Sequence, residues 1–231
     1  MGHDYAAGTV HSPCYRADLM HWVDLAEDVA IAYDYNKMPQ TLPTFPSIAR
    51  PLPNSSEVRE ALVGLGYTQA ISWTLTNAEL NFSKIGLKPA PMATAVNPLT
   101  TDFTSLRTHL LPGLLSILSQ NIHNPMPQRI FELGLTYDKN GRESLELCGV
   151  GEHAGATFSE AKSALEALLL ELGENDCAIL PHEVPSLAPG RSCVVKKHGK
   201  EVGYVGELSD EVRRNFGLAL PITVFALRLW Q

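Results

Sequence analysis

The chain has 231 residues, of which 45% are hydrophobic and 19% charged. A chain of this length forms one large domain, or one domain and a fragment, and it can bury a core without disulfides or a structural metal. Its net charge is −7 and its pI about 5.6, so the surface as a whole repels a phosphate backbone. The composition excludes a disordered or collagen-like protein and disfavours one that binds nucleic acid on its own.

The cysteines and the apolar segments indicate the cellular compartment in which the protein is expected. The four cysteines form no CxxC pair, which argues against a zinc ribbon or a disulfide scaffold and favours a reducing, cytoplasmic setting. The longest apolar runs, Leu110–Leu118 and Ala167–Leu172, are far shorter than the ~20 residues of a membrane span. The N-terminus lacks the basic and apolar regions of a signal peptide. We therefore expect a cytoplasmic protein with no membrane association.

Residues 1–38 contain too little regular structure to form a core. Apolar residues recur at helical spacing from Asp24 to Tyr35, and Asp24 with Glu27 has the spacing of a capping box. The residues before this helix suit one strand and a turn. We therefore expect residues 1–38 to be the C-terminal remnant of a domain that begins upstream. Five prolines between residues 39 and 53 then predict an extended linker.

Residues 54–231 predict a single α+β domain. Helices mixed with hairpin-linked strands, without regular βαβ alternation, indicate a mainly antiparallel sheet flanked by helices. Asn54 and Glu57 have the spacing of a capping box for the first helix. Further expected elements are strands at 130–137, 145–150, 194–195, 202–207 and 222–230, a turn at His198 and Gly199, and helices that start after Thr157 and Ser209.

Two of the expected strands carry informative side chains. Ile71, Trp73 and Leu75 alternate with polar residues, which is typical of a half-buried strand. Arg129 and Glu132 belong to the strand that follows the leucine-rich segment, where they could present charge to a nucleotide. They could equally form one salt bridge on an edge strand, which is the commoner outcome. The sequence alone leaves both interpretations of the charged residues open.

Four carboxylates cluster around the start of the first helix. Asp24, Glu27 and Asp28 are spaced i, i+3 and i+4, so they share one face at the helix N-terminus, and Asp18 precedes them in the turn. Oxygen-only ligands of this kind suit Mg²⁺. Acidic residues are also favoured in any first helical turn by capping and by the helix dipole. The pattern thus fits either a metal site or a simple cap.

The segment from Leu110 to Ile122 predicts a helix with a wide apolar face, with Pro112 in its first turn. A helix that packs on one sheet face needs about 100° of apolar arc, and this one has distinctly more. Exposed apolar patches usually mark interfaces, so we expect a second chain to cover the excess, or a second copy of this chain when it is isolated. The expected interface residues are Leu110, Leu111, Leu114, Leu115, Ile117, Leu118 and Ile122.

Five blocks of sequence, in order, resemble the C-terminal module of the phenylalanyl-tRNA synthetase β subunit: NPLTTDFTSLRTHLLPGLL, RIFELG, HAGATFSEAKSALEALL, GKEVGYVGELSDEVRRNFGL and VFALRLW. The opening YRADLMHWVDLAEDVAIAYDYNKMP is similar to the end of the helix-turn-helix-like domain that precedes this module. The resemblance extends from Pro13 to Trp230. Because no anticodon-binding domain follows, the chain resembles the archaeal or eukaryotic type, and the family's editing domain would lie upstream.

This resemblance implies a class II aminoacyl-tRNA synthetase fold that is catalytic-like but not catalytic. In the family the α subunit joins phenylalanine to tRNA(Phe) with ATP, and the two subunits form an α₂β₂ heterotetramer through which tRNA is bound. Class II sites take one arginine from an FRxE-like strand and another from a Gly-rich motif. In this chain Arg129 precedes the phenylalanine of RIFE, and no Gly-rich motif accompanies Arg228. A site without both cations cannot stabilise the transferring phosphoryl group, so we expect no catalytic residue here.

The resemblance also implies roles for two sets of residues. The family's Mg²⁺ ligands carry over onto Asp18, Asp24, Glu27 and Asp28, with Asp28 at a position where the family often has the longer Glu. We expect the ion in the intact subunit rather than in this chain alone. The leucine-rich segment corresponds to the family's contact with its α subunit. The rival interpretation is a free-standing synthetase paralogue that regulates or binds a ligand, which a gene beginning near Met1 would favour.

Overall fold

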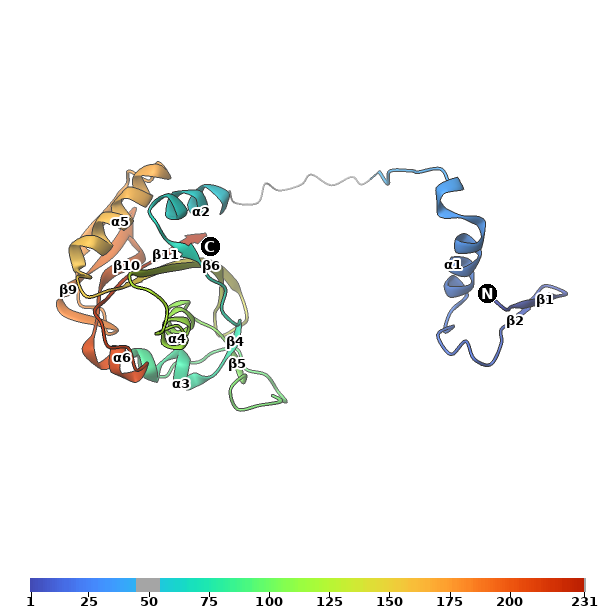
Figure 1. Cartoon of the computed structure of the whole chain (residues 1–231), viewed down its shortest axis with the longest axis horizontal. Coiled ribbons are helices and arrows are strands. Elements are labelled where there is room, and N and C mark those ends of the chain that lie inside the picture. The colour runs from blue at the N-terminus through green and yellow to red at the C-terminus, as the bar shows by residue number, and fades with distance from the viewer. Residues whose placement is uncertain (45–54, 231) are drawn as a thin grey trace. The chain divides into compact units, whose positions relative to one another are not determined.

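The structure, a computed structural model, describes residues 1–44 and 55–230. The chain divides into two compact units, Met1–Pro51 and Leu52–Gln231 (Figure 1). Most of the predicted linker and the predicted cap residue Asn54 lie outside the described residues. No helix within the two described ranges is both long and apolar enough to cross a bilayer.

The N-terminal unit consists of a hairpin and one α-helix. Strands β1 (Asp4–Ala6) and β2 (Thr9–His11) pair antiparallel, and α1 (Trp22–Tyr33) is followed by a 3₁₀ turn, η1 (Tyr35–Lys37). The hairpin adds one strand to those that the sequence predicts. With one α-helix in its described part, this unit does not confirm the predicted helix-turn-helix-like remnant.

The start of α1 differs from the prediction. Its N-cap is His21, and the Asp24 carboxylate accepts hydrogen bonds from the amides of Met20 and His21 at 2.8 and 2.7 Å. The predicted capping box of Asp24 with Glu27 is therefore wrong. Asp24 occupies the third helical position, from which an acidic side chain reaches back to cap the amides that the helix leaves unpaired.

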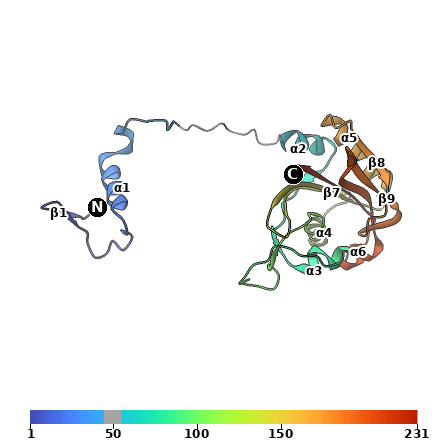
Figure 2. The same ribbon diagram turned by 180° about the vertical axis from the view of Figure 1, so that it is seen from behind.

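A seven-stranded sheet forms the centre of the C-terminal unit (Figure 2). The strand order is β3-β6-β7-β11-β10-β9-β8, and all neighbours are antiparallel except β3 and β6. This confirms the predicted α+β class with a mainly antiparallel sheet. The strands are β3 (Thr68–Gln69), β6 (Gln128–Tyr137), β7 (Glu143–Glu152), β8 (Cys177–Pro181), β9 (Leu187–Lys197), β10 (Lys200–Leu208) and β11 (Ile222–Trp230), beside a separate pair, β4 (Leu75–Thr76) and β5 (Ser105–Leu106).

Helices cover both faces of this sheet and create two cores. One core joins α4, α6 and η2 to residues such as Val150 and Ala226, and the other joins α2 and α5 to residues such as Leu147 and Phe225. Alternation along β7 and β11 sends neighbouring side chains to opposite cores. The helices are α2 (Ser55–Gly64), α3 (Ala78–Asn81), η2 (Ser83–Ile85), α4 (Leu111–Gln120), α5 (Phe158–Glu171) and α6 (Asp210–Asn215).

In the C-terminal unit, the following predictions that rest on local cap and turn residues are confirmed. Thr157 caps α5, and Ser209 caps α6. His198 and Gly199 have φ angles of 50° and 77° and form the turn between β9 and β10. Pro112 lies in the first turn of α4, where its missing amide hydrogen costs nothing.

The predicted half-buried strand at residues 71–75 is wrong. Ile71 and Trp73 are 84% and 81% exposed, and only Leu75 belongs to a strand, the two-residue β4. The alternation is inverted, because Ser72 points inward and donates its hydroxyl to Glu132 Oε2 at 2.6 Å. A buried carboxylate needs hydrogen-bond donors, and Ser72 supplies two, its hydroxyl and its amide.

A buried ion pair joins β6 to the segment before α4. Arg107 Nη1 lies 2.5 Å from Glu132 Oε1, with side-chain exposures of 8% and 2%. The same guanidinium donates to the Leu135 carbonyl at 2.8 Å and to Ser72 Oγ at 3.0 Å. Both charges are removed from water, and both are well supplied with polar partners, which is the condition for tolerating a buried ion pair.

Two glycines make room for this network. A Cβ atom at Gly134 would lie 2.5 Å from Arg107 Nη2, and one at Gly113 would lie 2.2 Å from Ser72 Oγ. Since real Cβ atoms do not approach so closely, the backbones of β6 and α4 reach the network only because both positions lack a side chain.

We expect the variant Arg107→Met to lose about 3–5 kcal/mol of unfolding free energy, because it leaves the buried Glu132 carboxylate without its cation. The double variant Arg107→Met/Glu132→Leu should recover part of this loss, since it removes both charges. Urea denaturation followed by circular dichroism measures both. The control Arg214→Met, at an exposed position, should change stability by less than about 0.5 kcal/mol. A loss no larger than that of the control would contradict the importance of the pair.

Candidate functional site

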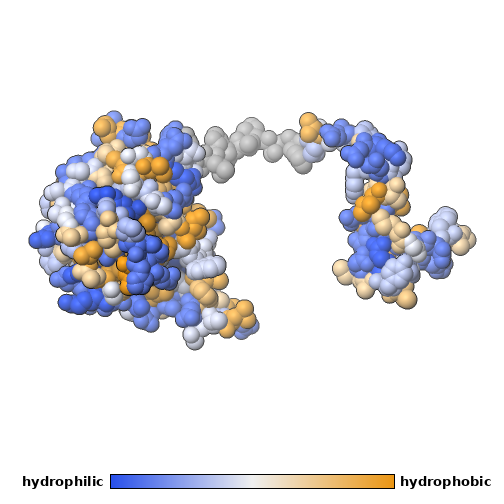
Figure 3. Space-filling view, viewed as in Figure 1, coloured by the Kyte–Doolittle hydropathy of each residue, from blue (hydrophilic) through white to orange (hydrophobic). Residues whose placement is uncertain are grey.

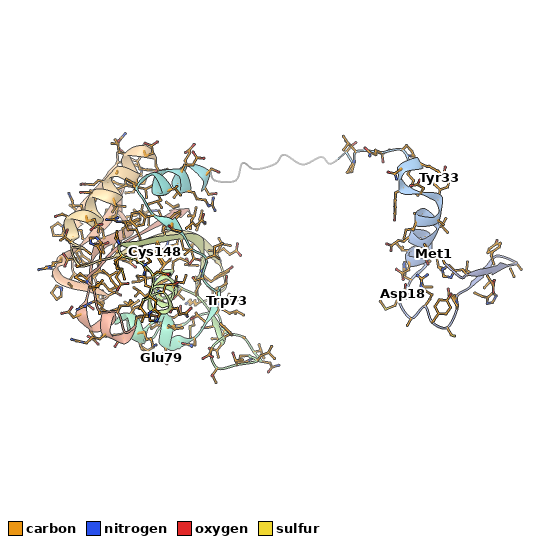
Figure 4. The ribbon with its side chains drawn as sticks, viewed as in Figure 1. Met1, Asp18, Tyr33, Trp73, Glu79 and Cys148 are labelled. Atoms are coloured by element: carbon orange, nitrogen blue, oxygen red, sulfur yellow. The ribbon has the colours of Figure 1, made fainter. Side chains whose placement is uncertain are left out.

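Two of the four predicted metal ligands are paired with one arginine. Arg16 Nη2 lies 2.7 Å from Asp18 Oδ2, and Arg16 Nη1 lies 2.7 Å from Asp28 Oδ2 (Asp18 is labelled in Figure 4). His3 Nε2 lies 2.8 Å from the same oxygen of Asp28. The hydrogen bonds from Arg16 lower the pKa of Asp18 to about 2 and, with the contact from His3, hold the pKa of Asp28 below its usual range. Both carboxylates are therefore ionised at neutral pH, and they share the single positive charge of Arg16.

The other two predicted ligands face elsewhere. Asp24 caps the amides at the start of α1, and Glu27 is exposed. Within residues 1–44 and 55–230, no three His, Cys, Asp or Glu side chains gather closely enough to hold a metal ion. The helical spacing that predicts a shared face is present, but Asp18 and Asp28 are paired with Arg16, whereas Asp24 accepts from backbone amides. As arranged, these residues do not fit Mg²⁺, because Arg16 takes the position between Asp18 and Asp28.

The charged residues of β6 lie on opposite faces of the sheet. Arg129 pairs with Glu160 of α5, with Nη2 2.8 Å from Oε1, and His153 Nε2 lies 2.7 Å from the other carboxylate oxygen. Glu132 points to the opposite face, because an odd separation along a strand reverses the side. The interpretation of Arg129 and Glu132 as one salt bridge on an edge strand is therefore wrong. Strand β6 lies between β3 and β7, and each charge pairs with a different element.

The leucine-rich helix α4 lies inside the unit. Five of the seven predicted interface residues are at most 1% exposed, namely Leu110, Leu111, Leu114, Leu115 and Leu118. The prediction that these five contact a second chain is wrong, because the sheet covers one side of the stripe and residues of η2 and α6 cover another. Only Ile117, which is half-buried, and Ile122, which is 52% exposed, keep accessible surface.

A cleft of about 420 Å³ with a mixed polar and apolar lining opens beside Ile117, and exposed apolar side chains form part of its rim. Ile71 and Trp73 are almost fully exposed, and Phe103, which is 41% exposed, packs edge-on against Trp73 with ring centroids 6.3 Å apart. Figure 3 shows apolar side chains at the surface around β4 and β5, and Figure 4 labels Trp73 in this region. The sequence predicts Ile71 and Trp73 on the buried face of a strand, and the structure exposes both.

Sequence reasoning missed a buried carboxylate on β7. Glu146 is 6% exposed, and its Oε2 is shielded from solvent without a hydrogen-bond partner among the described residues. Burial raises the pKa of Glu146 to about 7, although Arg228, the Thr136 hydroxyl and the Leu110 amide oppose the rise. The signal was present in the strand pattern, because Glu146 is two residues from the buried Cys148 and therefore shares its face.

The fold of this chain is that of a class II aminoacyl-tRNA synthetase. A pyrrolysyl-tRNA synthetase from Desulfitobacterium hafniense superposes with a TM-score of 0.63, covering 75% of this chain and 64% of that one. The sequences are 16% identical, so this similarity concerns the fold alone.

The sequence comparisons define the family. Residues 38–229 match the phenylalanyl-tRNA synthetase β chain CLM domain, and residues 3–35 match the tRNA synthetase B5 domain. The chain belongs to the phenylalanyl-tRNA synthetase β chain family. The phenylalanine–tRNA ligase β subunit of Archaeoglobus fulgidus is 37% identical over 223 residues, and that of Methanothrix thermoacetophila is 35% identical over 221. Each alignment covers 94% of this chain, which spans about 40% of the length of these relatives. The resemblance to this family is thus confirmed.

The buried Glu146 makes stability depend on pH. Its pKa rises from 4.5 to about 7 on folding, so between these values the folded chain binds a proton that the unfolded chain has released. Stability from this group is therefore greatest below about pH 4.5 and is lost as the pH rises to about 7. The variant Glu146→Gln should escape this loss and gain up to about 3 kcal/mol over the wild type at pH 8.

Urea unfolding at pH 5 and pH 8 measures this difference. His109, whose pKa is lowered to about 4 by burial and by Arg228, is present in both proteins and cancels in the comparison. The exposed Glu171→Gln serves as the matched control and should show no such dependence on pH. A gain for Glu146→Gln that is equal at both pH values would contradict the assignment.

Proposed function

We propose that this chain is the catalytic-like part of a phenylalanine–tRNA ligase β subunit, and that it supports an α subunit that joins phenylalanine to tRNA(Phe) with ATP. The observation that carries the proposal is the order and extent of the match, in which the B5 and CLM domains follow one another over nearly the whole chain. On this proposal the activity belongs to the assembled cytoplasmic ligase, of whose β subunit this chain is a part, since the chain spans about 40% of the length of the named relatives.

On this proposal the chain alone does not form phenylalanyl-adenylate. Arg129 is held by Glu160 on the face that carries α5. Arg228 lies directly across from Glu146 in the strand register, on the face that carries α4. Two arginines that bind the phosphates of one nucleotide must reach the same side of the sheet, and these two are separated by it.

The proposed contact with the α subunit is the apolar rim beside α4. It consists of Ile71, Trp73, Phe103 and Ile117, together with Ile122 just beyond the helix. Neighbouring exposed apolar side chains of this kind usually mark an interface. Two such αβ pairs would form the α₂β₂ heterotetramer, and tRNA would reach this chain through that assembly.

A Mg²⁺ ion at Asp18, Asp24, Glu27 and Asp28 is proposed for the intact subunit only. Arg16 pairs with two of these carboxylates in the described arrangement, so the ion would have to replace it. Mg²⁺ bound to the native state would raise the melting temperature of the intact subunit, and Asp24→Asn should weaken that response. If Mg²⁺ does not change the melting temperature, the carboxylates serve only to cap the helix and to form ion pairs.

Association with the α subunit tests the proposed contact. The double variant Trp73→Ser/Ile117→Glu should weaken binding to the α subunit of the same organism at least about tenfold, since it removes an aromatic anchor and inserts a charge. Leu170→Glu is the matched control, because Leu170 is 74% exposed on α5, on the other side of the sheet. Sedimentation measures binding, and circular dichroism checks the fold.

Equal binding by the wild type and the double variant would show that the α subunit contacts a different surface of this chain. A wild-type chain that does not bind the α subunit at micromolar concentration would instead favour the alternative function, a free-standing paralogue that regulates or binds a ligand.

A further inference from the structure

The turn between β6 and β7 contains an asparagine followed directly by a glycine. Asn140 is exposed, and Gly141 has a φ angle of 77°, with no atom beyond its chain neighbours within 4 Å of the place where a Cβ would lie. A side chain on the following residue hinders the attack of its backbone nitrogen on the asparagine amide, and glycine lacks one. Such an attack closes a cyclic imide and releases ammonia. Asn140 and Gly141 therefore have the composition and the exposure that this reaction requires.

The other asparagines in the described ranges lack this combination. Asn97 and Asn124 precede prolines, whose nitrogen carries no hydrogen and cannot attack. Asn175 is exposed, but an aspartate follows it, and the aspartate side chain hinders the attack. The remaining ones engage their side-chain amide groups in hydrogen bonds, namely Asn36, Asn77, Asn81, Asn121 and Asn215. Within the described part of the chain, the Asn140 side chain makes no hydrogen bond, although its backbone amide does.

The Asp138 carboxylate holds the turn in its closed form. Its Oδ1 accepts hydrogen bonds from the amides of Asn140 and Arg142 at 2.7 and 2.9 Å. The amide of Gly141, whose nitrogen would have to attack, donates to the Asp138 carbonyl at 3.0 Å. Hydrogen bonds from the Arg142 and Asn140 amides hold the pKa of Asp138 below its usual range, so the carboxylate stays ionised at neutral pH. The attacking nitrogen is thus released only when the turn opens, and Asp138 opposes that opening.

We propose that Asn140 is a site of spontaneous deamidation and that Asp138 sets its rate. The nitrogen of Gly141 forms a bond to Cγ of Asn140, the bond from Cγ to Nδ2 breaks, and Nδ2 leaves as ammonia with the proton that Gly141 loses. Water then opens the cyclic imide at one of its two carbonyl carbons. Opening at Cγ gives aspartate, and opening at the backbone carbonyl gives isoaspartate. The net reaction replaces the amide by a carboxylate and consumes one water, without an oxidant or a reductant.

The product changes the charge and the main chain of this hairpin. The new carboxylate lies close in the chain to Asp138 and Glu143, and like charges at such spacing repel one another. Isoaspartate also routes the main chain through the side-chain carbon, which lengthens the turn by one methylene group. Both products weaken the pair that ends the ladder, Tyr137 with Glu143. The modification is local and does not depend on the proposed function.

Incubation of the full chain in H₂¹⁸O at neutral pH, followed by peptide mapping with mass spectrometry, tests the proposal. The heavy oxygen marks each residue that converts during the experiment, and a synthetic peptide of residues 136–144 gives the rate without the folded turn. We expect Asn140 to convert at least about tenfold faster than Asn175, and the peptide to convert faster than the folded chain. Full conversion of the peptide with none detectable at Asn140 in the folded chain would overturn the proposal, as would faster conversion at Asn175.

Variants of the turn test the role of Asp138. Asp138→Ala should speed the conversion of Asn140 by at least about tenfold, because it removes two charge-assisted hydrogen bonds that keep the turn closed. Asp138→Asn, which keeps an acceptor oxygen, should speed it less. Glu143→Ala is the matched control and should leave the rate unchanged, because the Glu143 carboxylate makes no hydrogen bond with the described residues.

Circular dichroism of each variant verifies the fold. An unchanged rate in a folded Asp138→Ala, or an equal acceleration in Glu143→Ala, would contradict the role of Asp138.

Discussion

The buried contact between Arg107 and Glu132 links several segments of the C-terminal unit. It joins the middle of β6 to the segment that leads into α4, and therefore the sheet to the helix at the centre of one core. Ser72 turns inward to complete it, which leaves Ile71 and Trp73 at the surface. An unpaired buried charge costs about 3–5 kcal/mol. Separating β6 from the segment before α4 would therefore lower the free energy of unfolding substantially. The same contact thus organises a core and creates the apolar rim.

Helices cover both faces of the sheet, and the face on which a charged side chain lies determines which groups it can contact. Arg129 reaches α5 and is neutralised by Glu160, while Arg228 projects to the other face, beside Glu146. The fold is that of a class II synthetase, and the sheet separates the two arginines that the sequence offers for binding phosphate. That separation is the structural basis of our proposal that the chain supports catalysis by another subunit.

Sequence patterns predict the local features of this chain well and the long-range ones poorly. The Thr157 cap follows from residues within one helical turn, so spacing alone identifies it. Ser72 points inward because it donates a hydrogen bond to Glu132, which lies sixty positions further along the chain. A local alternation of polar and apolar residues could not predict that contact. Among the site residues, Asp28 has the spacing of a metal ligand, but its partner is Arg16, which precedes the helix and carries no periodic signal. The family resemblance predicts the class of the protein because it draws on the whole chain at once.

The central claim is that this chain completes a ligase and does not catalyse by itself. Phenylalanine-dependent exchange of pyrophosphate into ATP, measured with the chain alone, the α subunit alone and the two combined, tests this most directly. We expect exchange with the combination and none above background with the chain alone. Exchange by the chain alone that is abolished in Arg129→Gln or Arg228→Gln would contradict the account, because it would mean that the two arginines act together in spite of the sheet between them.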